Sequence, residues 1–437
     1  MHLLLMALVF FGVTLDEITI LDITEGIWVA PGYLAVEEAT IDPVDYNAEP
    51  MGVDVRMDGA IRLACLGFFV ETDEGEKWRI VMVFKDKVIV VQEDTETREI
   101  PLTISGQGAF FSKGGRYVLV HEGIYGSTAN ELINIDEGAS EPFDYGLSDG
   151  VTFTWVGDDG TVLTHLTQDR HTGEYGLLSF YDHSELVNTV EGGFAGVSMS
   201  RDGSLIICGG YPANDPLADY AAIAFDREGS RLWIFELNPD MHLHPSGVAI
   251  APNGEYVIIN GNAGLECYSG AEGELHWRSN GWYSVISPSG EYCLLEWRNY
   301  NDADRMANHV PIEEIEWGLI SCRQSDLILD SECSPVLNIR GTPQATSDNG
   351  NSLLYYRNCN IRPASNHRYC VMDPDGNIFM ITPWYSTNTG SHSAGQQNNN
   401  SEPTLGAWTA ALSRTGMKFL YDDGYSIHVI RIEEAAE

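Results

Sequence analysis

Short runs of hydrophobic residues alternate with polar turn residues along most of the chain, and these runs are rich in Val, Ile, Tyr and Phe. Such runs predict β-strands, because β-branched and aromatic side chains fit the pleated surface of a sheet. The clearest example is the turn Ala251-Pro252-Asn253-Gly254, which comes just before the run Tyr256-Val257-Ile258-Ile259. Glycine at the end of such a turn supplies the positive φ angle that a tight connection between strands needs. The pattern therefore predicts an all-β chain of hairpins.

The same turn recurs along the chain, always with a strand-like run behind it. Its final glycines are 36 to 66 residues apart and lie at Gly75, Gly115, Gly160, Gly203, Gly254, Gly290, Gly350 and Gly416. Repeats of roughly 45 residues with several short strands each are typical of a β-propeller, in which blades bury their apolar faces against one another. We therefore predict a single β-propeller of eight four-stranded blades, or of seven if the first or the seventh turn is not a repeat signal.

The last repeat has three strand-like runs and the chain then ends at Glu437 without a fourth. An N-terminal segment is expected to complete this blade, either Val53–Arg56 or a strand within residues 17–38, because pairing the termini removes an open sheet edge. The predicted organisation is a signal-peptide-like segment at 1–15, an extension at 16–60 that supplies the closing strand, and the propeller at 61–437.

Residues 3–13 form an apolar run that is too short to span a membrane and has the length of a signal-peptide core. The usual positive flank is missing, since the first Lys or Arg is Arg56. We expect export, to the periplasm, the cell surface or the medium; the alternative is an apolar strand that stays in the fold. No other stretch approaches the roughly 20 apolar residues of a membrane helix.

Two segments carry a resemblance to known repeats. Leu265–Trp277 has a turn glycine followed by a tryptophan near the end of the blade, and Tyr220–Phe235 has Trp233 in the matching position. Here the chain resembles the WD40-like, YVTN and quinoprotein-like propeller repeats of exported bacterial proteins, over roughly residues 61–437. The resemblance implies the propeller architecture. It brings no cofactor-binding residue with it, because the Trp-Asp dipeptide and the vicinal cysteine pair of some such families are absent.

The charge balance narrows the choice of partners. There are 64 acidic residues against 24 Lys and Arg, which gives a formal net charge of −40. A chain this acidic repels phosphate groups, so we do not expect it to bind nucleic acid or anionic lipid. It attracts cations and basic proteins. The alternative explanation is a solvated surface that keeps the protein soluble and monomeric.

One group of residues has the spacing of a metal site. Asp240, His242 and His244 enter the fifth repeat, and alternation along a strand would place both imidazoles on one face. Ordinary loop histidines are the alternative. Asp373–Asn377 resembles the start of a calcium loop, which makes calcium the cofactor considered, although the downstream bidentate glutamate is missing and a simple turn also explains the segment.

Aromatic residues near predicted turns and inserts form a candidate ligand platform: Trp282, Tyr300, Trp384 and Tyr385. Residues of this kind also cap blade edges, which is the structural alternative.

The cysteines include two pairs with hairpin spacing. Cys322 and Cys333 lie eleven residues apart, as do Cys359 and Cys370. Each pair is a candidate disulfide across a hairpin, consistent with export, although spacing alone does not establish a bond.

These observations favour a secreted or periplasmic, non-catalytic propeller that binds a protein or a glycan through one loop face. The sequence has no P-loop and no His-Glu-x-x-His motif. Residues 146–150 match Gly-x-Ser-x-Gly but lack the strand before and the helix after that a hydrolase needs. The alternatives are a propeller hydrolase, lyase or quinone-linked dehydrogenase with a metal in the channel, and a structural component of a larger assembly.

Overall fold

The computed structural model describes residues 27–41, 64–106, 108–122, 129–145, 152–166, 176–212, 221–236, 248–261, 264–279, 281–298, 315–321, 342–358, 365–374, 377–383, 385–387, 410–422 and 426–435. All regular secondary structure in these ranges is β-strand. The chain forms two compact units. The central unit consists of Pro43–Ser279 and His392–Thr409; the terminal unit consists of Met1–Asp42, Asn280–Ser391 and Ala410–Glu437.

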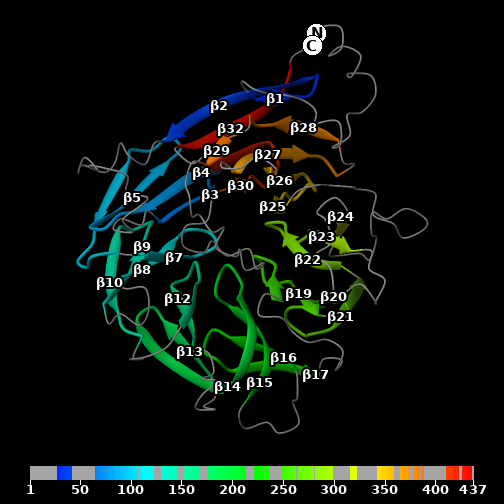
Figure 1. Cartoon of the computed structure of the whole chain (residues 1–437). Coiled ribbons are helices and arrows are strands. Elements are labelled where there is room, and N and C mark those ends of the chain that lie inside the picture. Colours follow the sequence, from blue (N-terminus) through cyan, green and yellow to red (C-terminus); the bar gives the residue numbers. More distant parts are fainter. Residues whose placement is uncertain are drawn as a thin grey trace. The chain divides into compact units, whose positions relative to one another are not determined.

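The central unit contains two separate sheets of four consecutive antiparallel strands (Figure 1). The first sheet consists of β3 (Ala64–Thr72), β4 (Gly75–Val83), β5 (Lys87–Gln92) and β6 (Arg98–Pro101). The second consists of β7 (Gly108–Phe111), β8 (Tyr117–His121), β9 (Asn130–Asn134) and β10 (Ala139–Phe143). Strands β3 and β7 lie in contact, so the sheets pack through their first strands.

A seven-stranded sheet follows, in which two four-stranded groups share one long strand. Its members are β11 (Thr152–Val156), β12 (Thr161–Leu166), β13 (Gly176–Asp182), β14 (Glu185–Met199), β15 (Leu205–Pro212), β16 (Ala221–Asp226) and β17 (Arg231–Glu236). The first half of β14 pairs with β13 and its second half pairs with β15. The last sheet of the central unit contains β18 (Val248–Ile250), β19 (Tyr256–Gly261), β20 (Gly264–Ser269) and β21 (Leu275–Ser279).

The terminal unit has three described sheets. The first consists of β22 (Gly281–Ile286), β23 (Tyr292–Arg298) and β24 (Ile315–Ser321). The second contains β25 (Thr342–Thr346), β26 (Ser352–Asn358), β27 (Ser365–Met372) and β28 (Ile378–Ile381), with β1 (Trp28–Val29) added beside β28 and β29 (Tyr385–Thr387) beside β27. The third has the order β2-β32-β31-β30, formed by β2 (Tyr33–Ile41), β30 (Ala410–Leu412), β31 (Lys418–Asp422) and β32 (Ile427–Glu434).

The third sheet of the terminal unit confirms the predicted pairing of the two ends of the chain. Strand β2 runs antiparallel to β32, with Tyr33 opposite Glu434 and Ile41 opposite Ile427 (Figure 1). The segment lies at Tyr33–Ile41, so the alternative at Val53–Arg56 does not supply this strand. The blade that the C-terminal residues begin is completed from the N-terminal side.

These sheets have the architecture of a β-propeller, with four-stranded antiparallel blades whose first strands contact each other within each unit. Five blades are separate within the described residues: β3–β6, β7–β10, β18–β21, β25–β28, and β30–β32 with β2. The all-β propeller fold is therefore confirmed, whereas the predicted count of eight blades, or seven, is not. The boundaries at residues 15 and 60 stay predictions.

The predicted turns are present at all eight positions. Every one of the eight repeat glycines has a positive φ angle, from +64° at Gly115 to +110° at Gly75. In most of the turns the glycine N–H donates to the carbonyl of the first turn residue, as from Gly254 to Ala251 at 2.8 Å. The first turn is tighter, since Thr72 and Gly75 pair directly across the hairpin. Glycine is needed here because other residues pay about 1–2 kcal/mol for this backbone conformation.

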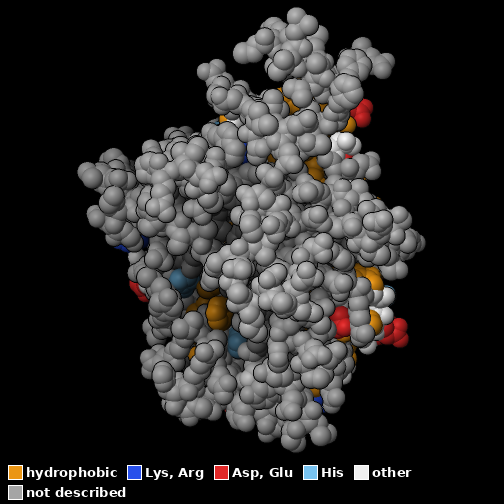
Figure 2. Space-filling model, turned by 45° about the vertical axis from the view of Figure 1, so that its right-hand side comes forward, with side chains coloured by type: hydrophobic (Ala, Val, Ile, Leu, Met, Phe, Trp, Pro, Cys, Tyr) orange, Lys and Arg blue, Asp and Glu red, His pale blue; other side chains and the backbone are white. Residues whose placement is uncertain are grey.

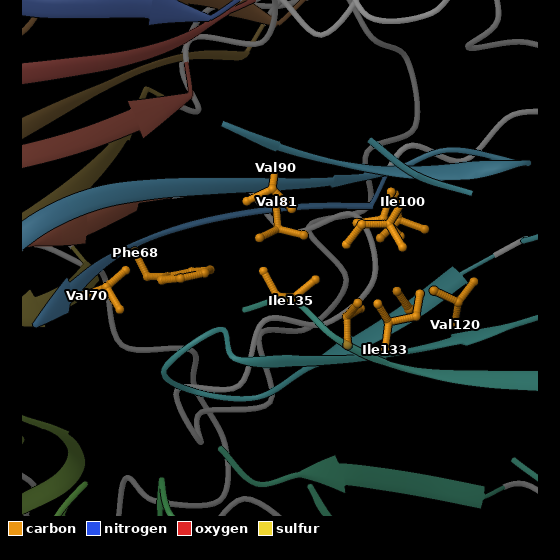
Figure 3. Close-up of a cluster of buried hydrophobic side chains, with 12 residues drawn as sticks. Phe68, Val70, Val81, Val90, Ile100, Val120, Ile133 and Ile135 are labelled. Carbon is orange, nitrogen blue, oxygen red and sulfur yellow. The ribbon is translucent and has the colours of Figure 1, made fainter. Parts of the chain in front are cut away.

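The core lies between blades. Figure 3 shows the cluster between β3–β6 and β7–β10, where Val81, Val118 and Ile133 are fully buried. Phe68 and Val70 from β3 close one side of this cluster. Because each blade is apolar on the faces toward its neighbours, a single blade leaves these side chains in water and is not stable alone.

Two aspartates each join three hairpin turns. In the central unit, Oδ1 of Asp158 accepts the N–H of Gly114 at 3.0 Å and Oδ2 accepts Nε of Arg201 at 2.7 Å. The three residues lie in the β7–β8, β11–β12 and β14–β15 turns. The Asp158 side chain is only 10% exposed. One carboxylate therefore links the β7–β10 sheet to the seven-stranded sheet and joins two hairpins of the latter.

The terminal unit repeats this arrangement. Oδ1 of Asp348 accepts the N–H of Ser289 at 2.7 Å, and Oδ2 accepts Nε of Arg414 at 2.6 Å. The backbone N–H of Asp348 also donates to the carbonyl of Arg414 at 2.8 Å. We refer to Asp158 and Asp348 as the bridging aspartates.

Ion pairs connect β2 to the C-terminal strands. Oε1 of Glu37 lies 2.7 Å from Nδ1 of His428. Glu38 lies 2.7 Å from Nε of Arg431 and 3.4 Å from Nζ of Lys418. The side-chain hydrogen bond from His428 is the main reason why the pKa of Glu37 lies below its usual value. These contacts make the attachment of β2 sensitive to charge.

We expect the contribution of Glu37 to stability to disappear in acid. Because its folded-state pKa is lowered, the stabilisation is present above pH 4.5 and is lost as the pH falls through the folded-state value. Glu37 is about half exposed, so Glu37→Gln should cost only about 0.5 kcal/mol at pH 7. Urea denaturation of both proteins at pH 7 and pH 3 measures this. An equal difference at both pH values would contradict the assignment.

Candidate ligand-binding face

Two buried histidines occupy equivalent positions in successive sheets of the central unit. His121 ends β8 and lies opposite Gly108 of β7; His165 lies near the end of β12, opposite Phe153 of β11. Their side chains are 6% and 5% exposed. Both follow the turn glycine of their blade by five or six residues, so the same strand edge carries an imidazole in both sheets.

We call this edge the histidine face. It consists of the first residues of β7, β9, β11 and β13 together with the last residues of β8, β10 and β12. The bridging aspartate Asp158 lies at the opposite edge, in the turn between β11 and β12. Figure 2 shows hydrophobic and histidine side chains side by side on one face of the molecule.

Aromatic rings surround His165. Phe153 stacks against it with ring centroids 6.3 Å apart and an interplanar angle of 29°, and Phe194 of β14 meets it edge-on, also at 6.3 Å. Trp155 lies 6.4 Å from Phe153. Phe153 is nevertheless 42% exposed, which places it among the few large hydrophobic side chains that the described surface presents to solvent.

The environment of His165 keeps its imidazole neutral. Burial lowers the pKa of His165 to about 4, because the charged form loses its hydration there. Its Nε2 atom is buried and has no hydrogen-bond partner among the described residues. A buried, unpaired imidazole nitrogen costs free energy unless a ligand or a water molecule satisfies it.

We expect this histidine to give a defined pH dependence of stability. The folded-state pKa lies below the unfolded value of about 6.5, so the unfolded chain binds the proton more tightly. Stability should be complete above pH 6.5 and fall as the pH drops toward 4, by about 2 kcal/mol at pH 5. Urea denaturation of the wild type and His165→Gln between pH 4.5 and 7.5 tests this. A His165→Gln profile identical to that of the wild type would contradict the prediction.

Part-buried hydrogen bonds join Tyr145, which follows β10, to β11 and β13. The Tyr181 hydroxyl donates to the backbone carbonyl of Tyr145 at 2.8 Å. The Thr154 hydroxyl donates to the side-chain hydroxyl oxygen of Tyr145 at 3.5 Å. Burial raises the pKa of Tyr145 to about 12, so the phenol stays protonated. Phe143 packs against both tyrosine rings.

The described part of the histidine face carries exposed carboxylates. Glu122 follows His121, Asp144 follows β10, and Glu191 lies opposite Leu177 on β14; all three side chains are exposed. No Lys or Arg lies among the described strand ends of this edge. The face therefore combines exposed carboxylates, an exposed aromatic ring and a neutral imidazole.

The site residues predicted from the sequence are not brought together by the described part of the structure. Asp240, His242, His244, Tyr300 and Trp384 lie outside the described residues. Trp282 lies in β22 and Tyr385 lies in β29, but the structure describes only the backbone of these two residues. The metal site and the aromatic platform therefore stay predictions, as does calcium. The described residues contain no group of three or more metal-ligating side chains.

One observation bears on the two predicted disulfides. Cys370 is buried in β27 with a free thiol, which does not support its bond to Cys359. Cys359, Cys322 and Cys333 lie outside the described ranges, so both pairings stay predictions. Burial also raises the pKa of the Cys370 thiol to about 12, so this group is unreactive near neutral pH.

The histidine face itself was not identified from the sequence. His121 and His165 are widely separated in the chain and belong to no motif. Their similar placement, six and five residues after the turn glycine, is the available signal, but it has meaning only once strand pairing is known. Among the described residues no helix is long and apolar enough to cross a membrane.

Comparisons with known proteins leave the family open. No protein-family model and no curated protein matches the sequence. Among solved structures, a chain of the mitotic checkpoint complex is 11% identical, with a TM-score of 0.40, and the match covers 91% of this chain and 94% of that one. Hydrazine synthase of Kuenenia stuttgartiensis is 12% identical, with a TM-score of 0.39 and coverage of 89% and 100%. TolB of Acinetobacter baumannii is 11% identical, with a TM-score of 0.33 and coverage of 76% and 81%. The fold assignment rests on the sheets described above.

Proposed function

We propose that this chain is a non-catalytic β-propeller that binds a protein or a glycan through the histidine face. The observation that carries the proposal is the exposed ring of Phe153 above the buried, unpaired nitrogen of His165. An exposed aromatic ring stabilises a partner by removing apolar surface from water. The Nε2 atom of His165 is itself buried, so the exposed ring of Phe153 is the group that a partner reaches.

Site-specific photo-crosslinking tests this function in the full chain. Benzoylphenylalanine in place of Phe153 should crosslink to a defined partner in the cells that produce the protein. The same replacement at Leu232, which is 50% exposed on β17, is the control position. A crosslinked product formed at position 153 and not at 232 is expected. The same products at both positions, or none at position 153, would refute the proposal.

We also propose eight blades. The count follows if the seven-stranded sheet is two blades that share β14 and if the three-stranded sheet β22–β24 is one blade. An experimental structure with seven or fewer blades would overturn it.

We further propose export to the periplasm, the cell surface or the medium, based on the apolar run at residues 3–13. N-terminal sequencing of the protein from its own cells should show that this run has been removed. An intact Met1 on the mature protein would refute export by this route.

A further inference from the structure

We propose that the histidine face recognises a basic protein, which inserts a lysine or arginine side chain over Phe153 and beside His165. This inference rests on the proposed function, because it names the chemical class of partner for the same surface.

The first argument is the chemistry of the rings. The face of an aromatic ring carries partial negative charge and attracts a cation placed over it. Phe153 offers an exposed ring, and Trp155 and Phe194 extend the aromatic surface on either side of it and of His165. A cluster of rings with one exposed member suits a cationic side chain better than a purely aliphatic one.

The second argument is the state of His165. A protonated imidazole would repel a cation, whereas the buried neutral ring does not. The Nε2 atom of His165 has no hydrogen-bond partner among the described residues and is buried, so the exposed Phe153 ring is the group that places the cation.

The third argument is electrostatic complementarity. Glu122, Asp144 and Glu191 expose carboxylates along the same edge. The whole chain has a formal net charge of −40. Such a field draws basic partners to the surface and disfavours anionic ones, while the aromatic cluster determines where on that surface a cationic side chain docks.

Hexa-arginine labelled with fluorescein is a suitable probe, with binding to the full chain followed by fluorescence anisotropy at 0.15 M salt. Phe153→Leu keeps an apolar side chain but removes the ring, and Phe153→Ala removes both. Leu232→Ala, on the exposed side of β17, is the matched control. We expect Phe153→Leu to weaken binding about two- to fivefold, Phe153→Ala at least as much, and Leu232→Ala not at all.

Three results would overturn the inference. Equal binding by all four proteins would mean that hexa-arginine is held only by net charge. A loss with Phe153→Ala but not with Phe153→Leu would mean that the residue provides an apolar contact and not a cation site. Phe153-dependent binding to a glycan array, with hexa-arginine binding unchanged, would assign the face to carbohydrate.

The crosslinking experiment separates this inference from the proposed function. Specific crosslinks at position 153 together with any of these three results leave a binding face whose ligand is not a cationic side chain. Absence of crosslinks at position 153 rejects the binding face itself, whatever the peptide does.

Discussion

Replacing Gly115 by alanine should destabilise the central unit by about 3–4 kcal/mol. Gly115 has φ of +64°, and a Cβ atom placed there would lie 1.7 Å from Cζ of Phe68. Phe68 belongs to the buried cluster between β3–β6 and β7–β10, so its ring cannot turn away without opening that core (Figure 3). The substitution therefore combines an unfavourable backbone conformation with overpacking of the core.

Gly254 provides a matched control for this substitution. It ends the equivalent turn of a later blade and has φ of +70°, but a Cβ atom there would meet nothing closer than 3.9 Å. Gly254→Ala should therefore cost only the backbone term, about 1 kcal/mol. Urea denaturation of the two variants measures the difference between them. Equal losses of stability would show that Phe68 does not confine the turn at Gly115.

The success at the turns shows which part of the fold the sequence determines locally. The glycines of the repeated turn are required by the backbone at each site, so a reader of the sequence can find them without knowing any distant contact. The spacing of these turns then implies repeated antiparallel hairpins, and the observed sheets are of that kind.

The closing strand shows a part of the fold that depends on distant partners. Tyr33–Ile41 contains the adjacent residues Glu37 and Glu38, which interrupt the apolar pattern expected of a strand. Their carboxylates pair with His428, Lys418 and Arg431, almost 400 positions later. Nothing near residue 37 in the sequence indicates these partners, so only the general location of the strand could be predicted.

The candidate site was missed for a similar reason. Its features are created by pairing between strands: Phe153 lies opposite His165 in one sheet, and Phe194 joins them from β14. In the sequence these are isolated aromatic residues within strand-like runs. The sequence instead predicts a metal site at His242 and His244, because their spacing is visible without knowledge of strand pairing.

The second prediction with a large effect concerns the bridging aspartates. Asp158→Ala should destabilise the central unit by about 3 kcal/mol, because it removes two hydrogen bonds to a carboxylate that is largely buried. The N–H of Gly114 and the guanidinium of Arg201 would both lose this partner. Asp158→Asn should cost less, about 1–2 kcal/mol, since an amide oxygen still accepts from Gly114 but the charge opposite Arg201 is gone.

A surface ion pair distinguishes this effect from a general loss of charge. Glu99 lies 3.2 Å from Lys87 but is 58% exposed, so Glu99→Ala should change the free energy of unfolding by no more than about 0.5 kcal/mol. The corresponding change in the terminal unit, Asp348→Ala, should cost about 2–3 kcal/mol, because the same two kinds of hydrogen bond are lost at a slightly more exposed site. Chemical denaturation with hydrogen exchange read separately for each unit measures these values. A loss at Asp158 no larger than that at Glu99 would mean that the turns are held by packing alone, and that the repeated carboxylate bridge contributes little to joining one blade to the next.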